Sequence, residues 1–102
     1  MKTMTMTEIK RIHREKWKRA NWFGPDEMKF FRTELGSGGY VSPTTGLIYF
    51  ATSEQGSHMP RRGTVRFMNP ETGEVATHGT FGGYSSIGAA DKAAEKIAAE
   101  VR

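Results

Sequence analysis

The chain has 102 residues, of which 36% are hydrophobic and 11% aromatic, which is enough for one globular domain with a modest core. The absence of cysteine excludes disulfides, thiol nucleophiles and cysteine-bound zinc, and it favours a reducing, cytoplasmic setting. The net charge of +4 is unevenly distributed: residues 1–19 carry seven bases and two acids, whereas the remainder carries eight bases and nine acids. No apolar run has membrane-spanning length, so we expect a single domain over residues 1–102 that makes no membrane contact.

The basic N-terminal segment is predicted to form an amphipathic helix. Thr5-Met6-Thr7-Glu8 has the spacing of a capping box, and helical periodicity continues to about Ala20. One side of this helix gathers Ile9, Ile12, His13, Lys16 and Ala20, and the opposite side gathers Lys10, Arg11, Arg14 and Lys18. Gly24 and Pro25 end the helix, and Trp22 and Phe23 are expected to fold back as a plug, so that residues 1–22 form one unit.

From Met28 onward the pattern is typical of strands. The expected strands are Met28–Leu35, which ends at a turn formed by Gly36-Ser37-Gly38-Gly39, and then Tyr40–Ser42, Leu47–Ser53, Thr64–Asn69 and Glu74–Phe81. The turns Ser42-Pro43-Thr44-Thr45-Gly46 and Asn69-Pro70-Glu71-Thr72-Gly73 share one pattern, with Pro at the first corner and Gly at the left-handed position. Two matching hairpin signals predict an antiparallel meander of four to five strands within residues 28–81.

The last segment is predicted to be an Ala-rich helix. Ser85 or Ser86 caps it, and it runs from Ile87 to near Arg102. Its apolar stripe consists of Ala90, Ala93, Ala94, Ile97 and Val101, whose small members allow close approach to a sheet. The sequence therefore predicts an α+β fold: an N-terminal helix, the meander, and a C-terminal helix over residues 86–102 that packs on one sheet face.

Several segments of the sheet region carry a recognisable pattern. They are Met28-Lys29-Phe30-Phe31, Tyr49-Phe50-Ala51-Thr52-Ser53-Glu54-Gln55, Pro60-Arg61-Arg62, Thr64-Val65-Arg66, Asn69-Pro70-Glu71-Thr72-Gly73 and Gly79-Thr80-Phe81-Gly82-Gly83-Tyr84. Over about residues 28–98 this pattern resembles a family of small uncharacterised proteins of phage and prophage genomes. No activity is established for that family, so the resemblance implies a short accessory protein of a mobile element. The basic first helix is not a fixed part of the pattern.

The basic helix is the first candidate for a functional surface. Its cations Lys10, Arg11, Arg14 and Lys18 could contact nucleic-acid phosphates with salt-dependent affinity, or they could meet an acidic groove on a protein. The simpler interpretation is a solvated helix face. A binding role is favoured to a similar degree, because the charge is concentrated in one segment.

The Glu54–Arg62 loop is the second candidate. Its adjacent Arg61 and Arg62 suit recognition of phosphate or carboxylate groups, although a plain strand connector with solvated arginines is the commoner case. The glycine-rich passage over residues 79–86 matches neither a P-loop nor a dinucleotide-binding fingerprint. We expect that passage to reverse the chain and let the last helix dock closely.

The residues give little support for catalysis. His13, His58 and His78 are far apart, none has a metal-ligand spacing, and no carboxylate pair has a diagnostic spacing, so no enzyme activity, metal or cofactor is expected. Most aromatic residues are expected in the core. Phe30 and Phe31 are adjacent on a predicted strand, however, so one of them must leave the helix-covered face and indicates an interface.

These observations lead to a hypothesis of function. The chain is expected to be a phage or mobile-element protein that inhibits a host protein or nucleoprotein complex by occlusion, most naturally a defence complex, as an anti-CRISPR protein does. Its partner-binding residues would be Lys10, Arg11, Arg14, Lys18, Arg61 and Arg62. The alternative is a nucleic-acid-binding accessory protein whose basic helix lies on phosphates. Either protein could be a monomer or a homodimer.

Overall fold

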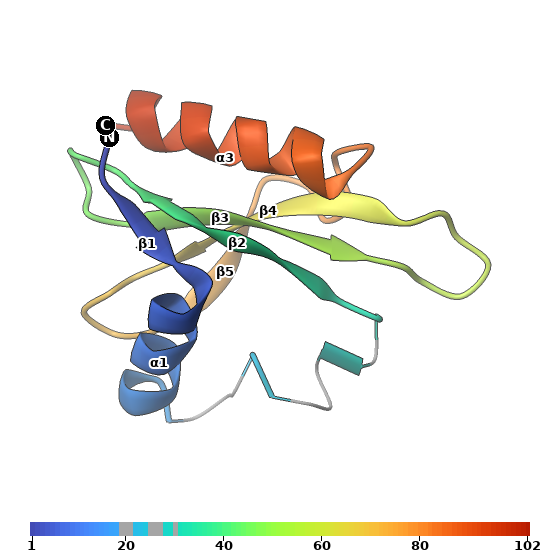
Figure 1. Ribbon diagram of the computed structural model, residues 1–102, viewed down its shortest axis with the longest axis horizontal. Helices are drawn as coiled ribbons and strands as arrows, with labels where there is room; N and C mark the ends of the chain where they lie inside the picture. Colours follow the sequence, from blue (N-terminus) through green and yellow to red (C-terminus); the bar gives the residue numbers. More distant parts are fainter. Residues whose placement is uncertain (19–21, 25–27, 30) are drawn as a thin grey trace.

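The computed structural model describes residues 1–18, 22–24, 28–29 and 31–102, and it has the expected α+β fold with an antiparallel sheet between an N-terminal and a C-terminal helix (Figure 1). The elements in chain order are β1 (Thr3–Thr5), α1 (Met6–Lys16), β2 (Glu34–Val41), β3 (Ile48–Glu54), β4 (Arg62–Met68), β5 (Val75–His78) and α3 (Ile87–Glu100). The strand order is β1-β2-β3-β4-β5, so each strand pairs with its neighbour in the chain and the predicted meander is confirmed.

The two turns with the shared Pro and Gly pattern close hairpins as predicted. Gly46 N donates a hydrogen bond to Ser42 O at 3.0 Å, and Gly73 N donates one to Asn69 O at 2.7 Å. Both glycines have a left-handed φ, +76° and +75°, which glycine adopts without steric cost. These turns join β2 to β3 and β4 to β5.

The glycine run of residues 36–39 does not form the predicted turn but lies inside β2. A Cβ on Gly38 would collide with Met4 O on β1, and a Cβ on Gly39 would lie 2.7 Å from Ile48 Cγ2 on β3. The β2–β3 register also shifts between Leu35 and Gly39. The prediction was wrong because these glycines serve the close approach of the neighbouring strands, which no local pattern reveals.

The predicted strand Met28–Leu35 is also wrong for most of its length. Thr33 N donates to Met28 O at 2.8 Å and Arg32 N donates to Lys29 O at 3.2 Å, so the described residues before Glu34 form local turns and not a strand. Arg32 has a φ of +47°, and the strand begins only at Glu34. At the other end of the meander, β5 ends at His78 instead of Phe81, just before Gly79 with its φ of +75°.

Helix α1 begins where predicted but is shorter. Thr5 Oγ1 accepts the hydrogen bond from Glu8 N at 3.2 Å, as a capping residue does. The Glu8 carboxylate does not complete the capping box, because it accepts a hydrogen bond from Arg11 instead. The helix ends at Lys16 rather than near Ala20, which lies outside the described residues. The short strand β1, which directly precedes it, was not predicted.

Helix α3 covers one face of the sheet. Ser86 is its N-cap, with Oγ accepting a hydrogen bond from Ala89 N at 3.1 Å. Of the predicted stripe, Ala90 and Ala94 are buried against β3 and β4, together with Ala98, which the prediction did not include. Gly63 on β4 allows this approach, because a Cβ there would collide with Ser86 O. The expected close docking of the Ala-rich helix is therefore confirmed.

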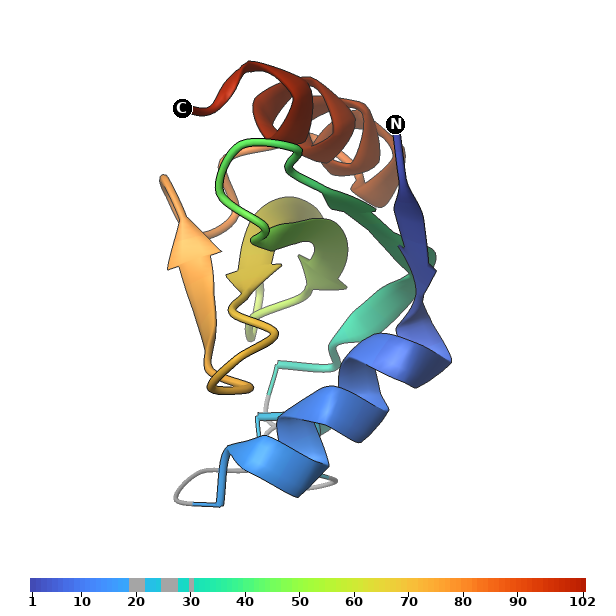
Figure 2. The same ribbon diagram turned by 90° about the vertical axis from the view of Figure 1, so that its left-hand side faces the viewer.

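The opposite face carries a second core, so the sheet is a middle layer with α3 above it and α1 below it (Figure 2). Met6 and Ile9 of α1 are buried with Phe50 of β3. Phe23, only 7% exposed, fills this core and packs edge-on against Trp22 at 4.8 Å between ring centroids. The predicted aromatic plug is confirmed.

Candidate functional site

Helix α1 is anchored on the sheet by a buried histidine. His13 is 0% exposed, and both of its ring nitrogens are bonded. Trp22 N donates to Nε2 at 2.8 Å, so Nε2 carries no proton, and Nδ1 at 2.6 Å from Gly73 O is therefore the donor of that bond. This histidine joins α1, the aromatic plug and the β4–β5 turn, which makes its role structural.

The β4–β5 turn is the second anchor of α1. Lys16 Nζ donates a hydrogen bond to Pro70 O at 3.0 Å, so this cation turns toward the body of the protein rather than toward a partner. A Cβ on Gly73 would lie 2.9 Å from Trp17 N, which shows how closely the turn meets the C-terminal end of the helix. Two backbone carbonyls of one turn, on Pro70 and Gly73, thus fix the direction in which α1 presents its outer side.

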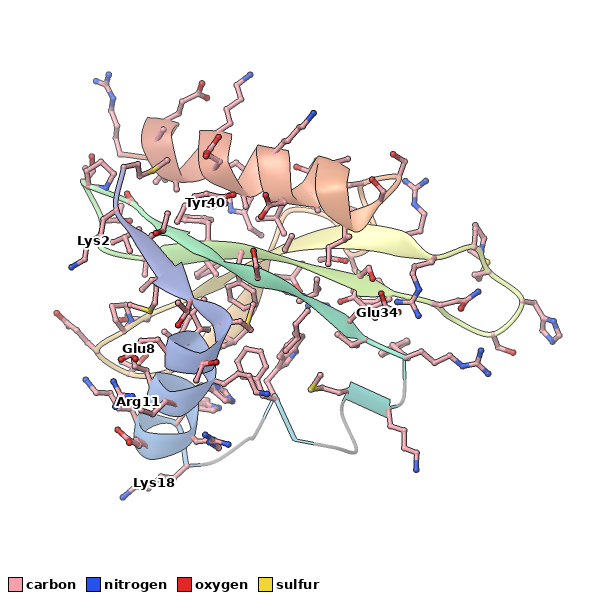
Figure 3. All side chains as sticks on the ribbon, in the orientation of Figure 1. Lys2, Glu8, Arg11, Lys18, Glu34 and Tyr40 are labelled. Atoms are coloured by element: carbon pink, nitrogen blue, oxygen red, sulfur yellow. The ribbon has the colours of Figure 1, made fainter. Side chains whose placement is uncertain are left out.

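Of the four predicted binding cations of α1, Arg11 is engaged within the helix itself. Its guanidinium forms ion pairs with Glu8 and, at 2.9 Å, with Glu15 (Figure 3). The hydrogen bond from Arg11 and its positive charge lower the pKa of Glu8, and the same pairs raise the pKa of Arg11. All three side chains are exposed, so these ion pairs contribute little to stability. The two carboxylates nevertheless offset the positive charge of Arg11 on the surface of the helix.

The remaining predicted cations of this segment are Lys10, Arg14 and Lys18. Lys10 is half-buried, whereas Arg14 and Lys18 are exposed, and none of the three forms an ion pair with a residue that the structure describes. Lys18 lies beyond the end of α1, not on its face as predicted, and it projects away from the body (Figure 3). We call Lys10, Arg14 and Lys18 the α1 cation group.

The other predicted pair, Arg61 and Arg62, is divided between different partners. Arg61, just before β4, donates from Nη1 to Ser53 Oγ at 3.0 Å, and its Nη2 lies 3.7 Å from Glu34 Oε1. Arg62, the first residue of β4, donates from Nε to Gly82 O at 2.9 Å. The two guanidinium groups are thus held by separate parts of the protein. Their adjacency in the sequence therefore does not create a joint site.

Sequence reasoning missed a buried polar network beside the α1 core. Glu54, 3% exposed, forms an ion pair with Arg66 at 2.7 Å and accepts a hydrogen bond from Thr64 Oγ1 at 2.6 Å. Thr52 also donates to Glu54 and accepts from Arg66 Nε at 3.2 Å. Arg66 Nη1 donates to Thr77 Oγ1 on β5. Every side-chain nitrogen and oxygen of this ion pair thus has at least one hydrogen-bond partner, which buried charge requires.

The signal for this network was present in the two predicted strands. Thr52 and Glu54 alternate on β3, as Thr64 and Arg66 do on β4, and the register places Thr52 opposite Thr64. Aligning the two strands would have placed all four on one face. Two aromatic rings then enclose the guanidinium of Arg66, whose Cζ lies 4.9 Å from the centroid of Trp22 and 5.4 Å from that of Phe81.

The three histidines do not assemble a catalytic group. His13 is structural, His58 lies in the β3–β4 loop, and His78 on β5 packs edge-on against Tyr49 at 5.6 Å between ring centroids. Within residues 1–18, 22–24, 28–29 and 31–102 no three His, Cys, Asp or Glu side chains are grouped to hold a metal ion. Over the same residues, no helix combines the length and the apolar character needed to cross a bilayer.

Comparison with known proteins yields one finding. A family model described as "Family of unknown function (DUF7447)" matches residues 5–95. The match confirms that the pattern belongs to an uncharacterised family, and it runs through α1, which the resemblance over residues 28–98 did not include. No curated protein and no solved structure matches the chain.

Proposed function

The chain belongs to the DUF7447 family, whose function is unknown, and on that premise we propose that it is a non-enzymatic binding protein that inhibits a macromolecular complex by occlusion. Its first contact surface is the outer side of α1. The observation that supports this is the fixed orientation of the helix: His13 and Lys16 bond to the β4–β5 turn, and Met6 and Ile9 enter the core. Lys10 and Arg14 are thereby held on a rigid element, with Lys18 just beyond its end, and this placement suits recognition of an anionic partner.

The mixed charge of α1 favours a protein partner over a nucleic acid. Glu8 and Glu15 are exposed beside the cations, and each is paired with Arg11. A phosphate backbone that lay along the helix would approach two carboxylates, whereas a protein surface can offer donors to them. An acidic protein surface with interspersed basic groups complements this pattern better than a uniform polyanion does.

The setting of this function is a phage or other mobile element acting in the host cytoplasm. The resemblance of residues 28–98 to phage and prophage proteins supports the origin, and the absence of cysteine supports a reducing compartment. A small protein without a recognised catalytic group can inhibit by covering a surface that its target needs. A host defence nucleoprotein complex, as for anti-CRISPR proteins, is the target we propose.

Charge reversal of the α1 cation group tests this proposal. The variant Lys10→Glu/Arg14→Glu/Lys18→Glu should lose binding to purified host defence complexes in pull-down assays and should no longer inhibit their activity. The matched control is Lys92→Glu/Lys96→Glu/Arg102→Glu, which makes the same change of net charge on and beside α3. Binding that survives reversal on α1 removes the helix from the mechanism, and equal loss in the control shows that only net charge matters.

A second candidate, direct binding of nucleic acid, is supported by the three cations that lack acidic partners among the described residues. Titration of duplex and single-stranded oligonucleotides at two salt concentrations separates it from the first. Contact of all three cations with duplex phosphates would give a log–log salt slope of about −3. The absence of binding at low salt excludes this candidate.

A further inference from the structure

The end of the molecule away from α1 carries a second surface, at the β3–β4 loop and the turn that precedes β2 (Figure 1). Three of the four large hydrophobic side chains that are exposed among the described residues belong to it: Phe31 at 37%, Met59 at 61% and Phe81 at 48%. Phe31 and Phe81 contact each other with ring centroids 5.4 Å apart. Exposed apolar groups that gather in one place mark an interaction site more often than scattered ones do.

A hollow lies beside Met59 and next to the turn that carries Phe31, although neither ring is among its lining residues. Its volume is about 430 Å³, and Arg32, Gln55 and Met59 are among its lining residues. Gln55 N donates a hydrogen bond to Phe31 O at 2.8 Å, which ties the loop to the turn that carries the first ring. Arg32 and His58, which both line the hollow, hold left-handed φ values of +47° and +60°, so the walls have a defined backbone shape. We call Phe31, Arg32, Met59 and Phe81 the aromatic surface.

The charge around the aromatic surface is positive. Arg32 belongs to it, Lys29 lies two residues before Phe31 and is exposed, and Arg62 is held beside Phe81 by its hydrogen bond to Gly82 O. Among the residues that the structure describes, the two acids of this region are already engaged. Glu34 faces Arg61 at 3.7 Å, and Glu54 is buried against Arg66. A partner of opposite charge, with an apolar group for the rings and Met59, is complementary to this surface.

The ring geometry favours a protein segment over a single-stranded nucleic acid. Consecutive bases stack on flat aromatic faces. The planes of Phe31 and Phe81 are inclined at 55°, and Phe81 has the Arg66 guanidinium against its ring. Two inclined rings beside a flexible methionine instead suit an inserted apolar side chain, and Phe, Met and Arg are residues enriched at protein interfaces.

We propose that the aromatic surface binds an acidic segment of a protein partner, which packs an apolar side chain against Phe31, Phe81 and Met59 while its carboxylates meet Lys29, Arg32 and Arg62. This surface lies apart from α1 and does not depend on the function proposed for the α1 cation group. The outer side of α1 and the aromatic surface would then contact either one partner at two places or two different partners.

Selection from a displayed random-peptide library against the intact protein tests this proposal, because the selected sequences report the chemistry of the surface directly. Enriched peptides should combine Asp or Glu with an aromatic or aliphatic residue. Synthetic versions should bind Met59→Ser and Phe81→Ser variants with a Kd at least about tenfold higher. Met59→Ser is the safer variant for folding, because the exposed side chain lies beside Gly56, and Met1→Ser is its matched control. Lys29→Glu should weaken binding and Lys96→Glu should not.

The α1 charge-reversal variant separates this proposal from the function proposed above, because it should keep the peptide affinity of the natural sequence. Amide NMR shifts on titration should map to the turn before β2, the β3–β4 loop and the passage around Phe81. The proposal would be overturned if the enriched peptides lacked acidic residues. It would also be overturned if Met59→Ser and Phe81→Ser bound the peptides as tightly as the natural sequence does, or if the amide shifts were confined to α1. Oligo(dT) that shifts the same amides more tightly than any selected peptide would assign the surface to single-stranded nucleic acid instead.

Discussion

Among single residues, Glu54 and Arg66 have the most unusual environment in the fold. Their side chains are 2% and 7% exposed, on β3 and β4 beside the apolar core that α1 covers. A buried ion pair is stable only when its remaining hydrogen-bonding groups are satisfied, and threonines of β3, β4 and β5 supply those partners here. The pair also positions Phe81, since the guanidinium lies against that ring.

Replacing one partner of this pair should be costly. Glu54→Gln keeps the shape but leaves the Arg66 guanidinium buried without a counter-charge, so the free energy of unfolding should fall by about 3 kcal/mol in urea denaturation. Glu34→Gln is the control, because the Glu34 side chain is 65% exposed and its pair with Arg61 is long. That change should cost less than about 1 kcal/mol. Equal effects of the two substitutions would show that burial of the Glu54–Arg66 pair does not increase its contribution to the free energy of unfolding.

At the scale of elements, two turns of the same sequence pattern have different surroundings. Both place glycine at a left-handed φ, but a Cβ on Gly46 meets nothing within 4 Å, whereas a Cβ on Gly73 would meet Trp17 N, Lys16 Cβ and Ile12 O of the N-terminal segment. One turn only reverses the chain. The other also holds α1 through its carbonyl groups.

Alanine at the two glycines should separate these roles. Gly46→Ala should lower the free energy of unfolding by about 1–2 kcal/mol, which is the cost of the left-handed conformation. Gly73→Ala adds steric overlap with the end of α1 and should cost about 1–3 kcal/mol more. Thermal unfolding of both variants measures the difference. If Gly73→Ala were no worse than Gly46→Ala, the contact between turn and helix would not be tight.

For the whole molecule, a hydrogen bond links α3 to β2, the strand next to the edge strand β1. Tyr40 Oη on β2 donates to Asp91 Oδ2 on α3 at 2.8 Å. This bond, together with burial, raises the pKa of Tyr40 to about 12, because ionisation would place a phenolate against a carboxylate. Burial also raises the pKa of Tyr49. The neutral phenols are therefore favoured by the folded state.

Stability should consequently decline at alkaline pH. Below pH 10, the ordinary pKa of tyrosine, the contribution of Tyr40 is complete, and it is lost as the pH rises from 10 toward about 12, because the unfolded chain ionises first. Urea unfolding midpoints across this range should fall less steeply for Tyr40→Phe and Asp91→Asn than for the natural sequence. If the urea midpoint fell equally steeply with pH in all three proteins, the Tyr40–Asp91 hydrogen bond would not be the cause of the alkaline decline.

The hairpins, the α3 stripe and the amphipathic nature of α1 were predictable because each depends on residues close in the chain. Pro43 with Gly46 specifies a turn by its own φ preferences, and Ser86 specifies a helix start. The failures came from contacts between distant residues. Gly38 belongs in a strand only because β1 lies against it, and β1 has no signal of its own.

The candidate site shows the same contrast between features set by residues close in the chain and features set by distant contacts. The cationic side of α1 was visible from helical periodicity, but the engagement of Arg11 and Lys16 depended on side-chain placement and on a turn more than fifty residues away. Arg61 and Arg62 looked like a pair because they are adjacent, yet Arg61 bonds to Ser53 of β3 and Arg62 bonds to Gly82 in the passage before α3. Phe31 of the aromatic surface is one of the two adjacent phenylalanines that were expected to indicate an interface, but the strand on which that expectation rested begins only at Glu34, and Phe30 lies outside the described residues.

The strictly sequential strand order has a consequence for how the chain folds. From β2 to β5 each strand finds its partner across a short connection, so little entropy is lost in closing each loop and the contact order of this part is low. The exception is β1, which pairs with β2 only after α1 and the long segment that follows it have been bridged. We therefore expect the hairpin sheet and α3 to form the folding nucleus, with β1 and α1 docking late. The outer surface of α1, which is proposed to bind a partner, would then be the last part of the molecule to form.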